Sequence, residues 1–140
     1  MGLILDQSSK LLVLRFMTLN QSIFLWEGVI HLTYVTNKGA AFSLFHDTPI
    51  GLKWISLVVS LGLIGLGIWA KSLHKFEKLG FGLILAGALG NGIDRFIYGY
   101  VIDFIELKFI RFPVFNLADI AINLGLFFLF LMLWQSRQEV

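Results

Sequence analysis

The chain has 140 residues, a length that suits a single domain. Hydrophobic residues make up 57% of it and charged residues 14%, and the mean hydropathy is +0.81; soluble domains carry roughly 25% charged residues, so lipid must surround much of this chain. The net charge of +2, with no basic run, argues against a nucleic-acid partner, and the lack of cysteine excludes disulfides, thiolate metal sites and cysteine nucleophiles.

The first predicted membrane span, residues 1–19, is the weakest of four. A bilayer is crossed by about 20 mostly apolar residues, but Asp6, Lys10 and Arg15 interrupt this stretch. Its start lacks the basic region and the small-residue cleavage site of a removable signal peptide. We therefore expect a damaged or truncated first helix.

The next segment carries the pattern of a strand. Within Val29–Val35, apolar residues alternate with His31 and Thr33, which is the period of a half-buried strand. Asn37-Lys38-Gly39 follows as a turn. We expect a small β-element over about residues 23–48.

Two further spans and the loop between them set the orientation. Leu52–Ala70 is a clean span, whereas Leu79–Tyr98 has the right length but is polar in its last third. The loop Lys71–Lys78 holds three lysines and one glutamate, so it is expected to be cytoplasmic. Both termini then lie inside, and the β-element and residues 99–116 lie at the outer membrane face.

The third span has two faces of interest. Gly82, Ala86 and Gly90 recur every four residues, and such a stripe of small residues lets helices approach closely in lipid. An adjacent face carries Asn91 and Asp94, with Arg95 one residue further on. We expect that polar face to point toward protein or water.

The last part of the chain combines an interfacial segment with a fourth span, residues 118–134. Phe104–Phe115 mixes charged and large apolar residues and suits an interfacial strand or loop. Asn116 and Asp119 lie three apart at the start of the span, so they can share a helix face. Asn116 also suits helix capping, and this role does not exclude a catalytic one.

Ionisable groups at membrane depth are costly and by default indicate function. Asp94, Asp103 and Asp119 are all expected near the outer face. Two carboxylates brought together can share one proton, as in aspartic proteases, although the sequence alone does not place Asp103 beside Asp119. The three histidines are scattered without ligand spacing, so we expect no metal or other cofactor.

Four short blocks make the chain recognisable: Asp6-Gln7 with Lys10, Asn37–Phe42, Gly90-Asn91 with Asp94-Arg95 through Asp103-Phe104, and Phe115–Asp119. The blocks occur in the order found in the bacterial lipoprotein signal peptidases (signal peptidase II). The chain resembles that family from about Asp6 to Asn123.

The resemblance implies a membrane-embedded aspartic endopeptidase that cleaves prolipoproteins before a diacylglyceryl-modified cysteine. Asp103 and Asp119 would be its catalytic dyad. The supporting residues, which would position the substrate or the dyad, are Asn37, Asn91, Asp94, Arg95, Asn116 and, to a lesser extent, Asp6.

The resemblance also implies an all-α membrane fold, a four-transmembrane-helix bundle with a small extracytoplasmic β-element, in the bacterial cytoplasmic membrane. Membrane lipids and the prolipoprotein would be the partners, with no obligatory protein partner. The family has roughly half a helix more before its Asp-Gln block, so we expect either an upstream start or a very short first span.

Three other functions compete with this interpretation. A proton-coupled transporter or channel would need ionisable groups throughout the bilayer, but the middle of Leu52–Ala70 has none. A noncatalytic scaffold leaves Asn91, Asp94 and Arg95 unexplained. A presenilin-type protease needs a Gly-x-Gly-Asp block, which Gly92 and Asp94 do not form.

Overall fold

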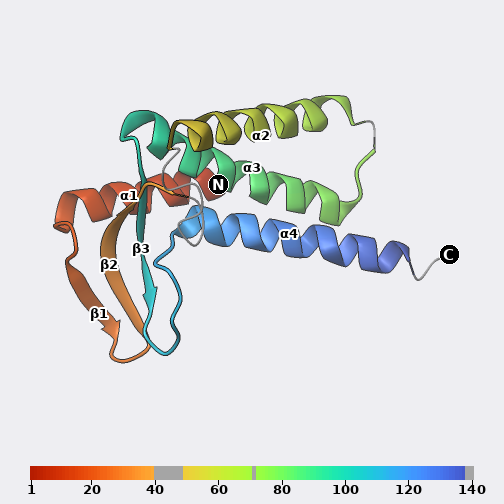
Figure 1. The fold of residues 1–140 in the computed structure, drawn as a ribbon. Coiled ribbons are helices and arrows are strands. Elements are labelled where there is room, and N and C mark those ends of the chain that lie inside the picture. Colours follow the sequence, from red (N-terminus) through yellow and green to blue (C-terminus); the bar gives the residue numbers. More distant parts are fainter. Residues whose placement is uncertain (40–48, 71, 138–140) are drawn as a thin grey trace.

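The computed structural model describes residues 1–39, 49–70 and 72–137. This part of the chain forms four helices and one three-stranded sheet. In chain order the elements are α1 (Gly2–Phe16), β1 (Ser22–Trp26), β2 (Ile30–Asn37), α2 (Pro49–Trp69), α3 (Lys75–Ile97), β3 (Val101–Leu107) and α4 (Leu117–Ser136). Helices α2, α3 and α4 run alongside one another, and α1 and the sheet lie at one end of them (Figure 1).

Two of the described helices are long and apolar enough to cross a membrane, Gly51–Trp69 and Leu117–Ser136. Only 11% of each apolar stretch is buried inside the protein, so most of its side chains face outward and require a lipid environment. Helix α1 is shorter, with 15 residues. Helix α3 has 23 residues but carries charged side chains near both of its ends.

Asp6 and Lys10, which interrupt the apolar sequence of the first span, do not break α1. They lie one helical turn apart, and both side chains are buried where α1 packs against α3 and α4. Charges that face the interior of a bundle and pair there avoid the cost of exposure to hydrocarbon. The interruption therefore marks the inward face of the helix.

Glycines bring α3 and α4 into backbone contact at two levels. A Cβ atom at Gly87 would collide with the carbonyl oxygen of Ala118, and one at Gly125 would lie 2.6 Å from the carbonyl oxygen of Gly80. Because only hydrogen fits at these points, the two helices approach more closely than helices with larger side chains can. The start of α4 is thereby held directly against the polar end of α3.

The expected stripe of small residues is only partly correct. Gly90 packs against Asp6 of α1 and Ala118 of α4, and Ala86 lies beside Gly2 of α1, so this part of the stripe contacts both helices. At Gly82, however, an added Cβ would meet no atom within 4 Å, so this glycine makes no close helix contact. The contacts with the α4 backbone are made by Gly80 and Gly87, which lie on a neighbouring face of α3.

The sheet is antiparallel in the order β1-β2-β3. Strand β2 contains most of the expected strand Val29–Val35, while the expected Asn37–Phe42 turn and β-element extend into residues 40–48, outside the described ranges. Strand β3 comes from the expected interfacial segment and starts earlier than Phe104. It joins the sheet to a core formed by Val13, Met17, Tyr34, Ile102 and Phe104.

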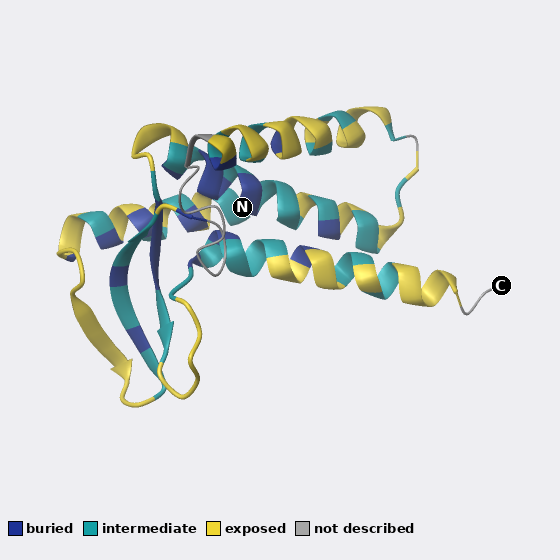
Figure 2. Ribbon diagram, viewed as in Figure 1, coloured by how far each residue is buried: buried dark blue, intermediate teal, exposed yellow. Residues whose placement is uncertain are grey.

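Burial is concentrated at one place in the molecule. Figure 2 shows buried residues where α1, α3 and the start of α4 meet the sheet, while α2, the C-terminal part of α4 and β1 are largely exposed. All five residues of β1 are exposed. The tightly packed region is therefore the junction between the helices and the sheet.

Candidate active site

Most of the buried polar side chains of the described chain form a single network at this junction. They come from α1, α3, β3 and the residue that caps α4, so four separate segments build one site. The buried members are Asp6, Lys10, Asn91, Asp94, Asp103 and Asn116.

Asp103 lies on β3 and is only 1% exposed. Its two carboxylate oxygens accept hydrogen bonds from the Asn37 Nδ2 at 2.9 Å and the Asn116 Nδ2 at 2.7 Å. The pairing of Val35 with Asp103 in the sheet brings Asn37 to this position from the end of β2. Asp103 is thus held by one side chain from the sheet and one from the start of α4.

Asp119 lies in the first turn of α4 and forms a capping box with Asn116, so the predicted capping role of Asn116 is confirmed. The Asn116 side chain accepts from the Asp119 backbone N–H at 3.0 Å, and the Asp119 carboxylate accepts from the Asn116 N–H at 3.2 Å. The other Asp119 oxygen accepts from the Asn91 Nδ2 at 2.7 Å. Capping leaves the Asn116 amide nitrogen free to bind Asp103.

The two carboxylates are connected through the same pair of asparagines. The Asn116 Nδ2, which binds Asp103, also donates to the Asn91 Oδ1 at 3.0 Å, and Asn91 binds Asp119. Each of the four carboxylate oxygens accepts one N–H. The sequence left the proximity of Asp103 and Asp119 open, and the structure brings them into one hydrogen-bonded group.

The electrostatics of Asp103 favour a retained proton. Burial, and then the nearby negative charge of Asp119, raise the pKa of Asp103 to about 7, although the hydrogen bonds from Asn37 and Asn116 act in the opposite direction. Two neighbouring carboxylates with one shared proton provide a general acid and a general base in one place. This is the chemistry that peptide hydrolysis by aspartic proteases requires.

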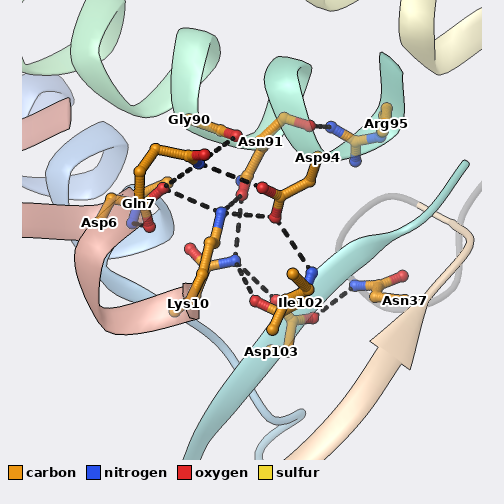
Figure 3. A network of polar contacts seen from close by, with 12 residues as sticks. Asp6, Gln7, Lys10, Asn37, Gly90, Asn91, Asp94, Arg95, Ile102 and Asp103 are labelled. Carbon is orange, nitrogen blue, oxygen red and sulfur yellow. Dashed lines mark hydrogen bonds and ion pairs between the residues drawn. The ribbon is translucent and has the colours of Figure 1, made fainter. Parts of the chain in front are cut away.

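A buried ion cluster lies next to the asparagines (Figure 3). The Lys10 ammonium contacts the Asp6 carboxylate at 3.0 Å and the Asp94 carboxylate at 2.8 Å. Gln7 donates to both carboxylates and to the Gly90 carbonyl. Asp94 also accepts from the backbone N–H of Ile102 at 3.1 Å, which ties α3 to β3 one residue before Asp103.

Arg95 lies on a different side of α3 from the ion cluster. Its guanidinium donates to the Gly39 carbonyl at 3.2 Å and the Ser56 hydroxyl at 3.4 Å. Gly39 also donates its backbone N–H to the Asn37 side chain. Arg95 therefore connects α3 with α2 and with the chain just after β2.

A groove of about 1320 Å³ runs past the two carboxylates. Its polar lining includes Asn37, Asn91, Arg95, Asp103 and Asp119. The remaining walls are mostly apolar and come from α2, α4 and the segment after β3, among them Ile55, Val59, Ile110, Phe112, Val114, Ile122 and Phe127. The carboxylates thus face a space suited to an extended, largely apolar molecule.

The supporting residues predicted from the sequence take three positions around the two aspartates. Asn37, Asn91 and Asn116 bind the carboxylates directly. Asp6 and Asp94 lie behind them in the ion cluster, and Arg95 lines the groove.

Lys10 and Gln7 belong to the network but not to the site residues predicted from the sequence. Both residues are part of the first family-like block. The sequence pattern alone indicated Lys10 only as a charge that interrupts the first span. The spacing of four between Asp6 and Lys10, within an apolar helix, is the signal that could have identified the pair. In the described ranges, no group of three or more histidine, cysteine or acidic side chains is arranged to hold a metal ion.

The family model described as Signal peptidase (SPase) II matches residues 1–135. The chain belongs to this family. The lipoprotein signal peptidase of Gloeothece citriformis is 57% identical over 131 residues, which cover 93% of this chain and 82% of that protein. The corresponding protein of Microcystis aeruginosa is 47% identical over 140 residues, covering 99% of this chain and 90% of that protein.

Solved structures agree with the family. One described as a bacterial membrane enzyme, at 2.3 Å resolution, superposes with a TM-score of 0.91 at 27% identity and covers 99% of this chain and 85% of that chain. A second bacterial membrane enzyme structure, at 1.9 Å resolution, gives a TM-score of 0.84 at 28% identity, with 94% and 86% covered. This chain is therefore a peptidase with the helix-rich fold of a membrane enzyme.

Proposed function

We propose that Asp103 and Asp119 are the catalytic dyad with which this chain, an aspartic endopeptidase of the signal peptidase II family, removes signal peptides from prolipoproteins. The observation that carries the proposal is the shared asparagine pair, which holds both carboxylates against one groove. The cleaved bond precedes a cysteine that carries a diacylglyceryl group.

The proton begins on Asp103. Its pKa is raised to about 7, whereas Asp119 is at the N-terminus of α4, where the helix dipole favours an anion. Asp119 takes a proton from a water molecule while the oxygen of that water attacks the scissile carbonyl carbon. Asp103 donates its proton to the carbonyl oxygen. When the C–N bond breaks, Asp119 passes its proton to the leaving amine, and the new carboxyl group forms as Asp103 regains its own.

The supporting residues have separate tasks in this scheme. Asn37, Asn91 and Asn116 orient the carboxylates through hydrogen bonds of 2.7–2.9 Å. Asp94 accepts from the backbone beside Asp103 on β3, and Asp6 accepts from the backbone beside Asp119 on α4, so they fix the two segments that carry the carboxylates. Arg95 lines the groove, where its guanidinium can bind the peptide backbone or the lipid ester groups of the substrate.

The membrane arrangement follows from the distribution of charge. In the described ranges, the basic residues Lys75 and Lys78 lie at the opposite end of α3 from Asn91 and Asp94. With that basic end in the cytoplasm, the carboxylates lie at the outer face of the bacterial inner membrane and both termini lie inside. All four helices then cross or enter the bilayer, including α1 and α3.

The test is cleavage of a lipobox peptide with and without its diacylglyceryl group, by the purified chain in matched membranes. The lipid buries at about 0.8 kcal/mol per CH₂ and confines the scissile bond to the depth of the dyad. We expect at least about a hundredfold slower turnover without the lipid, because proximity is lost. Equal rates would identify a general membrane protease and overturn the assignment to prolipoproteins.

A further inference from the structure

Lys10 is a buried cation behind the dyad, and all of its N–H donors are used. It is 1% exposed, and its ammonium group contacts three acceptors: Asp6 at 3.0 Å, Asp94 at 2.8 Å and the Asn91 Oδ1 at 3.0 Å. An ammonium group has three N–H donors, so all of them are used. Lys10 does not line the groove formed by the described residues, so it acts on the reaction only through its neighbours.

Its contact with Asn91 determines which way that amide points. An amide has one acceptor end and one donor end, and an ammonium group can only donate. The Asn91 oxygen therefore faces Lys10 (Figure 3), and the Asn91 nitrogen donates to Asp119 at 2.7 Å. A reversed amide would set two donors against each other at Lys10 and two acceptors against each other at Asp119.

We infer that Lys10 is a positioning residue of the catalytic site, which locks the Asn91 amide so that its N–H groups face Asp119. The inference rests on the proposed dyad. It assigns Lys10 a task beyond neutralising Asp6 and Asp94, because neutralisation alone would not require a contact with an amide oxygen.

The same cluster also fixes the turn of α4 that carries Asp119. The second oxygen of Asp6 accepts from the backbone N–H of Ala118 at 2.9 Å. The Asn91 oxygen held by Lys10 is also the acceptor for Asn116, which binds Asp103. A single buried ammonium group thus connects to both carboxylates through Asn91, and to the backbone beside Asp119 through Asp6.

The test removes the Lys10 ammonium together with the Asp6 carboxylate, so that the cluster of Asp6, Lys10 and Asp94 keeps the formal charge of the natural chain. Asp6→Asn keeps Lys10 and preserves an oxygen for Ala118, and it is the matched control for the double variant Asp6→Asn/Lys10→Met. We expect the control to lose less than about tenfold in kcat. The double variant should lose about a further hundredfold in kcat with KM unchanged, which is the order of the loss when one preorganised donor is removed.

The pH–rate profile separates positioning from a merely structural role. Lys10 is a nearby cation that lowers the pKa of Asp103. Its removal should therefore raise that pKa and move the alkaline limb of the profile to higher pH in the double variant and not in the control. A double variant that is folded, by its thermal unfolding curve, and has the kcat and profile of the control would overturn the inference.

A mutant cycle provides the second measurement. If Lys10 acts through Asn91, adding Lys10→Met to the Asp6→Asn/Asn91→Ala variant should change kcat by less than about threefold, because the contact between Lys10 and Asn91 is already lost. Independent, multiplying losses would overturn the inference. The cycle is interpreted together with Asp103→Asn and Asp119→Asn: turnover in those variants would refute the dyad itself, whereas their inactivity leaves the cycle as a test of Lys10 alone.

Discussion

The two ends of the α3–α4 pair are held together in the same way but contain different chemistry. At both ends a glycine brings the helix backbones into contact, Gly87 against Ala118 at one and Gly80 against Gly125 at the other. At the first end the buried side chains are polar and hydrogen-bonded, whereas the second end is surrounded by exposed apolar side chains of α4. Close helix packing is thus found at both ends of the α3–α4 pair. Among the described residues, only the first end also has a network of hydrogen-bonded polar side chains.

Exchanging a carboxyl group for an amide should give the largest difference in kcat between the two ends. Asp103→Asn and Asp119→Asn should each reduce kcat by at least about a thousandfold, because an amide can neither accept nor release the catalytic proton. The control is Glu77→Gln, the same exchange in the capping box at the other end of α3, where glutamine also caps. Near-normal turnover in either aspartate variant would remove that residue from the mechanism.

Adding a methyl group should reveal whether packing and catalysis are coupled. Gly87→Ala and Gly125→Ala should each destabilise the protein by about 1–3 kcal/mol, because both helices must move apart. Only Gly87→Ala should also lower the kcat of the folded protein, by roughly tenfold, since it displaces the turn that carries Asp119 from Asn91.

Gly82→Ala is the control for these two variants, because an added Cβ there meets no atom within 4 Å. Thermal unfolding and turnover are measured on the same preparations. Equal loss of kcat in Gly125→Ala and Gly87→Ala would show that the two ends are mechanically coupled.

The pH dependence of turnover should change only with substitutions at the polar end of the α3–α4 pair, beside Asp103. With the pKa of Asp103 at about 7, kcat should fall about tenfold per pH unit above that value, as the shared proton is lost. Asn37→Ala removes a hydrogen bond that lowers this pKa, so the alkaline limb should move to higher pH. Lys78→Gln, at the basic end of α3, should leave the limb in place; a profile that moves with Lys78 would contradict Asp103 as its origin.

The smallest expected effect is that of metal chelators. The proposed reaction uses only the carboxylates and water, so chelators should leave turnover within about twofold at both low and high substrate. Strong inhibition that is reversed by adding a divalent cation would overturn the aspartic mechanism at the polar end.

Local patterns in the sequence predicted the elements with a simple environment. The apolar run from Leu52 forms the largely exposed helix α2. The alternation around His31 and Thr33 located β2, although burial along β2 does not alternate and His31 itself is buried. Strand β3 begins with four consecutive buried residues, Val101 to Phe104, so it shows no alternation. Strand β1 is exposed along its whole length, and a strand without a buried face has no period to detect.

The sequence predicted which residues belong to the candidate site better than it predicted the hydrogen bonds between them. The family-like blocks identified the acidic and amide residues, but no local rule links Asp6 to Ala118, which are 112 positions apart. The direction of the Asn91 amide depends on Lys10, a contact across 81 positions. Such long-range hydrogen bonds are fixed by the packing of three helices, which the sequence pattern of any single helix does not contain.

The bond between Asp6 and the start of α4 has a consequence for biosynthesis. The ribosome produces α1 first and α4 last, so the acceptor for the Ala118 N–H is made long before its donor. Asp119 and the cap of its helix also arrive with this last segment. If Asp103 and Asp119 form the proposed dyad, a nascent chain that has delivered only α1, α2 and α3 to the membrane cannot cleave its substrate, and proteolytic activity begins only after α4 has been inserted.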